Sequence, residues 1–103
     1  MTAYNAGPYL ATGIDSMLNQ TYSVFRFLIV DDASTDNTRE IVRSYKDERI
    51  QLLCLDRNVG QTAALNIGLR QTSTRWIARM DADDYSAPTR LEEQMKALTE
   101  DHT

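Results

Sequence analysis

The chain has 103 residues, of which 42% are hydrophobic, with a formal net charge of −4 and one cysteine. These values fit one packed domain or part of one, and they disfavour both a polyanionic partner such as nucleic acid and an internal disulfide. No apolar stretch is long enough to span a bilayer and no signal peptide is visible, so we expect a cytoplasmic chain without a membrane span.

In chain order, short apolar runs alternate with amphipathic stretches. Met1–Ala3 precedes the first turn and is too short for a complete strand. Three runs rich in β-branched and aromatic residues predict buried strands: Phe25–Val30, Ile50–Leu55 and Trp76–Met80. Four apolar patterns with helical spacing follow the first turn and these runs, centred on Leu10–Leu18, Ile41–Tyr45, Leu65–Leu69 and Leu91–Leu98.

This alternation of strands and helices predicts an α/β fold, a mostly parallel sheet flanked by helices, with its first strand truncated. Right-handed crossovers place the carboxyl ends of parallel strands at one edge of the sheet. Ligands of such sheets bind outside those ends. Residues that directly follow the predicted strands are therefore the candidates for chemistry.

The strongest candidates are the carboxylates of Asp81-Ala82-Asp83-Asp84, directly after the last predicted strand. Asp81 and Asp83 are two residues apart, so in strand geometry both side chains point the same way. Converging carboxylate oxygens bind hard divalent ions such as Mg²⁺ or Mn²⁺. A solvated turn, with Asp84 or Ser86 capping the last helix, explains the same spacing equally well.

A second acidic pair, Asp31-Asp32, follows the strand at Phe25–Val30. The two side chains point in alternate directions, so at most one of them faces a site. The alternative is that this aspartate only holds the turn into the next helix. Arg79 shares a strand face with Asp81 and can pair with a carboxylate or with phosphate. Glycine-rich phosphate loops are absent, so diphosphate binding would depend on a metal ion.

Taken together, these residues resemble the amino-terminal half of inverting family 2 glycosyltransferases, which have the GT-A fold. The Ile29–Asp36 segment is very close to the family pattern I-V-D-D-G-S-T-D, with Ala33 in place of the usual glycine. Further segments match in register over nearly the whole chain: Thr2–Asn5, Ser16–Tyr22, Asn58–Gly60, Leu65–Leu69, Ala78–Asp84 and Pro88–Gln94.

The resemblance implies a Rossmann-like nucleotide-sugar site made by six positions: Thr2, Tyr4, Asp32, Gly60, Gln61 and Asp81. It implies that Asp83 is the principal ligand of Mn²⁺ or Mg²⁺, with Asp81 beside the ribose and the diphosphate. Asp32 would hydrogen-bond the nucleobase, and Tyr4 would stack on it with Thr2 lining the pocket. The Gly60-Gln61 region would close over the nucleotide.

The implied activity is metal-dependent, inverting transfer of a sugar from a nucleoside diphosphate, which we expect to be of the uridine type. The acceptor, a saccharide or a lipid-linked saccharide, is not defined. The family's catalytic base lies in an acceptor-binding half beyond the metal motif, so no catalytic residue is nominated here. We therefore expect residues 1–103 to be a single, incomplete GT-A domain that binds donor only.

Two alternatives remain from the sequence. A non-catalytic nucleotide-binding fragment has the same motifs. A phosphoacceptor receiver domain also places aspartates at strand ends, but it needs a lysine after the last strand, whereas Lys96 lies within the last helical pattern. Assembly into a homo-oligomer is left open.

Overall fold

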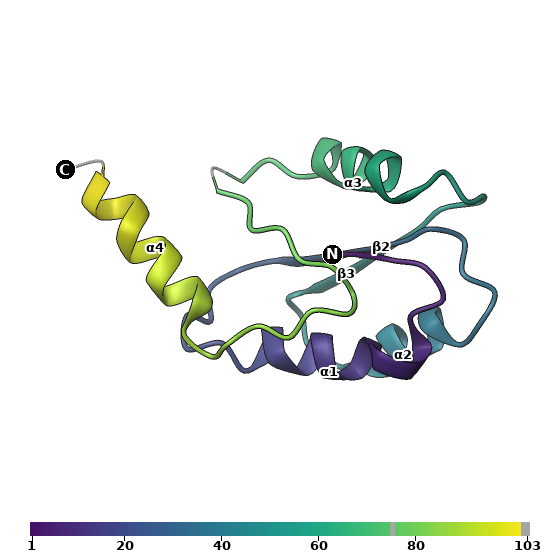
Figure 1. Cartoon of the computed structure of the whole chain (residues 1–103), viewed down its shortest axis with the longest axis horizontal. Coiled ribbons are helices and arrows are strands. Elements are labelled where there is room, and N and C mark those ends of the chain that lie inside the picture. Colours follow the sequence, from purple (N-terminus) through teal and green to yellow (C-terminus); the bar gives the residue numbers. More distant parts are fainter. Residues whose placement is uncertain (75, 102–103) are drawn as a thin grey trace.

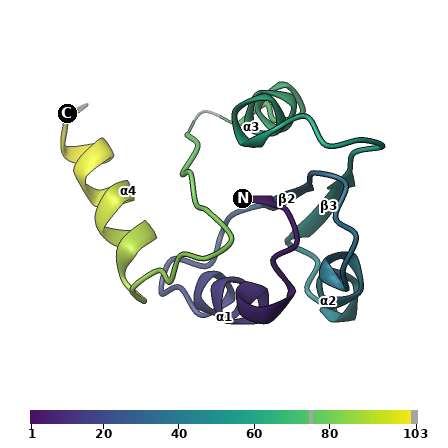
Figure 2. The same ribbon diagram turned by 45° about the vertical axis from the view of Figure 1, so that its right-hand side comes forward.

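The computed structural model describes residues 1–74 and 76–101. The elements in chain order are β1 (Thr2–Ala3), α1 (Gly7–Leu18), β2 (Phe27–Asp31), α2 (Thr38–Ser44), β3 (Ile50–Cys54), α3 (Gln61–Arg70) and α4 (Arg90–Asp101). The three strands form a parallel sheet in the order β1-β2-β3. Figures 1 and 2 show α1 and α2 on one face of the sheet and α3 on the other. The predicted α/β fold is confirmed.

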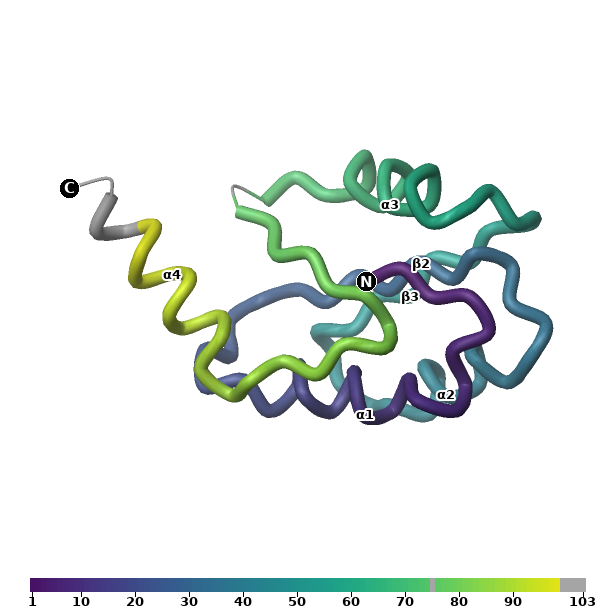
Figure 3. Tube along the Cα trace, viewed as in Figure 1, coloured from purple at the N-terminus to yellow at the C-terminus, as the bar shows by residue number. Residues whose placement is uncertain are grey.

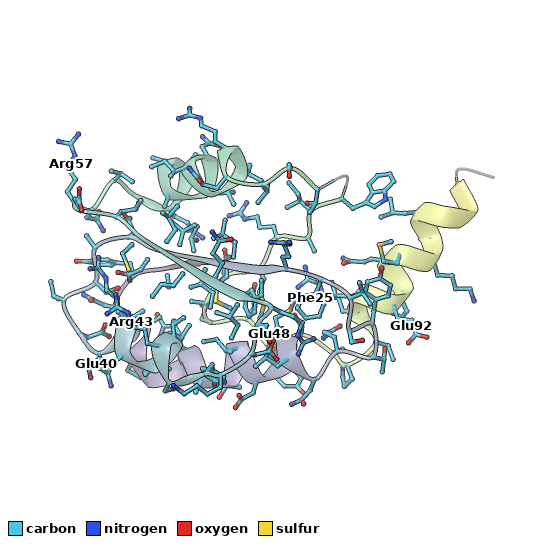
Figure 4. The ribbon with its side chains drawn as sticks, turned by 180° about the vertical axis from the view of Figure 1, so that it is seen from behind. Phe25, Glu40, Arg43, Glu48, Arg57 and Glu92 are labelled. Carbon is cyan, nitrogen blue, oxygen red and sulfur yellow. The ribbon has the colours of Figure 1, made fainter. Side chains whose placement is uncertain are left out.

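The strands end level with one another. Ala3 pairs with Asp31, and Asp31 pairs with Cys54, so the last residues of β1, β2 and β3 lie in one row. Figure 4 shows the opposite ends of the sheet, with Arg57 beyond the carboxyl end of β3 and Glu48 before its amino end. The loops that follow the strands therefore emerge together at the carboxyl edge.

The prediction of a strand at Trp76–Met80 is wrong. This segment makes no ladder, and the pairing with the sheet is limited to one parallel bridge between Thr2 and Asp81, the residue that follows it. A strand needs a partner backbone along its length, and β1 offers only two residues. Figure 3 shows the segment passing beside the N-terminus on its way to α4. Asp81 thus occupies the place of a fourth strand next to β1.

The core lies between the sheet and α1. Leu10 and Ile14 of α1 are fully buried against β1 and β2, and Met80 and Ala82 extend this cluster. On the other face, α3 approaches so closely that a Cβ on Gly68 would lie 2.8 Å from Val30 Cγ2. Among the helices of the described residues, none combines the length and the apolar character that crossing a membrane requires.

Ala33, which stands where the family pattern has glycine, has a left-handed backbone with φ of 60°. This conformation costs a residue with a Cβ roughly 1–2 kcal/mol, and the greater chain entropy of unfolded glycine offsets part of that cost. We expect Ala33→Gly to raise the free energy of unfolding by about 0.5–1 kcal/mol. Urea denaturation would show a higher midpoint at an unchanged m-value.

A matched control is Ala63→Gly, because Ala63 lies inside α3. There the same change lowers the free energy of unfolding by about 0.5–1 kcal/mol, since glycine is a poor helix former. If both variants were destabilised equally, the left-handed conformation of Ala33 would be contradicted.

Candidate functional site

The loops after β1 and β2 are hydrogen-bonded to each other. Asn5 has a left-handed backbone (φ 48°), and its side-chain oxygen accepts a hydrogen bond from the N–H of Thr35 at 2.8 Å. The Asp36 carboxylate accepts the N–H of Gly7, which starts α1, at 3.0 Å. A hydrogen bond from the Thr38 hydroxyl, more than any other contact, lowers the pKa of Asp36 below its usual value. These contacts give the two loops one fixed relative position.

Asp31 and Asp32 have opposite roles. The Asp31 carboxylate is completely buried, and it accepts hydrogen bonds from the Ser34 hydroxyl and the Arg39 guanidinium. Asp31 therefore holds the turn into α2. Of the two aspartates, Asp32 stays the one that is predicted to face a site.

Asp32 is held by the loop after β3. One of its carboxylate oxygens accepts the N–H of Val59 at 2.8 Å, and the other accepts the N–H of Gly60 at 3.0 Å. The Asn58 side-chain amide also donates to the Asp32 carbonyl oxygen at 3.2 Å. A carboxylate oxygen has two acceptor sites, so each oxygen of Asp32 can accept one more hydrogen bond. The carboxylate is thus oriented by the loop, in a residue that is only 3% exposed.

Asp81, Asp83 and Asp84 form an acidic cluster, in which one oxygen from each carboxylate lies within 4.8 Å of the others. Asp81 is half-buried and the other two are exposed. Three oxygen donors with open sides suit Mg²⁺ or Mn²⁺, which complete their coordination with water and phosphate. Asp84 accepts the N–H of Asp81 at 2.9 Å and lies well before α4. It therefore does not cap that helix; the sequence placed it in the acidic cluster, but it was not nominated as a metal ligand.

The acidic cluster is connected to Asp32 through two consecutive residues, Gly60 and Gln61, at the start of α3. Gln61, which follows Gly60, donates from its side-chain amide to the Asp81 carboxylate at 2.8 Å. The Arg79 guanidinium lies 3.7 Å from the same oxygen of Asp81, with 59% of its side chain exposed. Because Gly60 contacts Asp32 and Gln61 contacts Asp81, the loop fixes the separation of the two carboxylates.

The remaining predicted residues lie at the same edge. Thr2 pairs with Asp81, so it lies beside the acidic cluster. Tyr4 follows β1 with 49% of its surface exposed, which leaves its ring free to receive a flat ligand. The structure therefore brings the sequence-predicted residues to one edge of the sheet, through contacts between parts of the chain that are far apart in sequence.

Known proteins are similar to this chain over nearly its whole length. The family described as glycosyl transferase family 2 matches residues 1–103. An uncharacterized glycosyltransferase of Haemophilus influenzae is 39% identical over 99% of this chain and 42% of its own length. The Escherichia coli UDP-Glc:alpha-D-GlcNAc-diphosphoundecaprenol beta-1,3-glucosyltransferase WfgD is 39% identical over 95% of this chain and 39% of its own length. The chain thus spans about two fifths of these relatives.

Two solved structures show the same fold. Residues 1–349 of TarS of S. aureus, in complex with UDP, superimpose with a TM-score of 0.91 and 28% identity, over 98% of this chain and 31% of that solved chain. The mannosyltransferase PcManGT of Pyrobaculum calidifontis, in complex with GDP-Man and Mn²⁺, has a TM-score of 0.84 and 28% identity over 92% of this chain and 30% of its own. With its GT-A fold and a family match along its full length, this chain belongs to glycosyl transferase family 2.

Proposed function

We propose that this chain is the nucleotide-sugar-binding half of a metal-dependent, inverting glycosyltransferase whose donor is a uridine diphosphate sugar. The observation that carries the proposal is the loop that joins Asp32 to Asp81 at the carboxyl edge. The name of the E. coli relative includes a UDP-glucose donor, and TarS has been solved with UDP. These comparisons support a uridine nucleotide as the first ligand to test.

The base and the ribose would lie between the β1 exit and the loop at Gly60. The exposed ring of Tyr4 offers a stacking surface, and Thr2 borders the same region. Asp32 is only 3% exposed, and its carboxylate would accept one further hydrogen bond, such as that from the imide N–H of uracil, beside those from Val59 and Gly60. Gln61 would cover the nucleotide from the side of α3.

The diphosphate would lie over the acidic cluster, together with Mn²⁺ or Mg²⁺. From the family resemblance we assign Asp83, which is exposed, as the principal ligand, and Asp81 as the residue between metal and ribose. When bound, the ion neutralises the charge of the diphosphate and thereby favours its departure. The chain's own contribution is to hold the carboxylates at one edge, through Gln61 on one side and the Thr2 bridge on the other.

Transfer also needs a base that deprotonates the acceptor hydroxyl, and we nominate none of the described residues for that role. We therefore propose that the chain binds the donor without transferring the sugar by itself. Its acceptor in a longer protein would be a saccharide or a lipid-linked saccharide. A transfer assay with a radiolabelled UDP-sugar should show no product with this chain alone.

Isothermal titration calorimetry with UDP, in the presence and absence of Mn²⁺, tests the proposed function. We expect a binding isotherm with Mn²⁺ and a much weaker one with EDTA. A cooperatively folded sample that gives no heat with UDP and Mn²⁺ would refute donor binding. A mass shift on Asp81 after incubation with acetyl phosphate would instead favour a phosphoacceptor domain.

A further inference from the structure

Gln20, just beyond the end of α1, has a buried side-chain amide with partners on both of its polar atoms. Its surface is only 5% exposed. The amide nitrogen donates to the carbonyl oxygens of Ser16 at 3.1 Å and Ala87 at 2.8 Å. The amide oxygen accepts the N–H of Leu91 at 3.0 Å. One side chain thus binds the end of α1, the loop after the acidic cluster and the first turn of α4.

The contact with Leu91 replaces a helix cap. The first N–H groups of a helix have no acceptor within the helix, and Leu91 is the second residue of α4. Gln20 supplies that acceptor from a position 71 residues earlier in the chain. Its bond to Ala87 at the same time fixes the loop between Asp84 and α4. The start of the helix and the end of the acidic segment therefore share one anchor.

Neighbouring residues of α1 extend this contact. The Ser16 hydroxyl accepts the N–H of Ser86 at 3.1 Å. The Thr21 hydroxyl donates to the carboxylate of Glu92, which Figure 4 shows on α4, at 2.6 Å. At Gly13 the backbones are so close that a Cβ would lie 3.0 Å from the carbonyl oxygen of Ala82. One side of α1 therefore contacts the chain on both sides of Asp83-Asp84.

We propose that Gln20 is a positioning residue for the acidic cluster: it fixes the loop after Asp84 and thereby the direction in which the Asp83 and Asp84 carboxylates converge. The proposal rests on the proposed function, in which this cluster holds the metal ion. Gln20 itself does not touch metal or donor. Its effect passes through Ala87 and Leu91 to the backbone that carries the carboxylates.

Gln20→Met keeps the volume of the side chain and removes its hydrogen bonds. We expect the Mn²⁺ dissociation constant, measured with UDP present by the loss of the free-ion electron paramagnetic resonance signal, to rise about 10-fold or more, as for other residues that orient metal ligands. Tyr45→Phe is the matched control, because it removes a 2.7 Å hydrogen bond to Asp15 between α1 and α2, away from the cluster. Equal Mn²⁺ affinities in Gln20→Met and in the control would overturn the proposal.

Amide hydrogen exchange tests the same role without metal. Gln20→Glu keeps an oxygen that can accept the Leu91 N–H but places a carboxylate against the Ala87 carbonyl. We expect exchange to accelerate about 10-fold or more at Ser86, with Leu91 and the strand β2 protected as in the wild type. Uniform acceleration along the chain, or none at Ser86, would overturn the proposal. If the wild type failed to bind Mn²⁺, the proposed function would fail, and exchange would still decide the role of Gln20.

Discussion

Asp83→Asn is expected to weaken Mn²⁺-dependent UDP binding by more than about 100-fold, because it removes the charged oxygen of the principal metal ligand. The neutral amide keeps the shape of the side chain. Asp83 is exposed and lies within an acidic cluster, so the free energy of unfolding should change by no more than about 0.5 kcal/mol. Calorimetry and urea denaturation on the same sample separate the two effects.

The matched control for this variant is Asp56→Asn. Asp56 is an exposed aspartate in the loop after β3. It undergoes the same loss of one charge, so both variants change the net charge equally. UDP binding at the wild-type level in Asp83→Asn, or an equal loss in both variants, would contradict the assignment of Asp83 as a metal ligand.

Asp32→Ala is expected to abolish UDP binding and to lower the free energy of unfolding by about 2 kcal/mol. The carboxylate accepts the N–H groups of Val59 and Gly60, and hydrogen bonds to a charged group contribute roughly 1.5–3 kcal/mol. Its removal releases the loop that leads into Gln61 at the start of α3, so we expect the orientation of Asp81 to be lost as well. Thermal denaturation and calorimetry with UDP and Mn²⁺ measure the two effects.

The neighbouring aspartate provides the contrast. Asp31→Asn disturbs the buried contact with Arg39 and should destabilise the fold, yet the folded fraction should still bind UDP. If Asp31→Asn abolished UDP binding in folded protein while Asp32→Ala retained it, the roles of the two residues would be reversed.

The sequence predicted the fold class and most of the elements, because apolar periodicity records which side of each segment is buried. The sequence does not show at which residue the hydrogen-bonded pairing of the strands begins or ends. Phe25, predicted as the start of a strand, lies outside β2 and packs under the Arg49 guanidinium, 4.7 Å from the ring centroid. Trp76–Met80 has a strand-like composition, but a ladder depends on a neighbouring backbone that composition does not reveal.

Among the site residues, those that directly follow strands were predictable, because parallel strands end at the same edge of the sheet whatever the conformation of the loops. Asp32 and Asp81 are of this kind. The link between them through Gly60 and Gln61 was predicted only as a region near the nucleotide, and its hydrogen bonds emerge from the folded loop. The chemistry of Gln20 was not predicted, since its partners Ala87 and Leu91 lie 67 and 71 residues away.

The central claim is that Mn²⁺ and UDP bind together at the carboxyl edge, with the metal ion on Asp83. Anomalous scattering from crystals grown with MnCl₂ and UDP tests it most directly. We expect one manganese peak within roughly 2.5 Å of an Asp83 carboxylate oxygen, with the diphosphate on the same ion and the uracil between Tyr4 and Asp32. A manganese ion remote from Asp83, or UDP bound away from Tyr4 and Asp32, would contradict the claim.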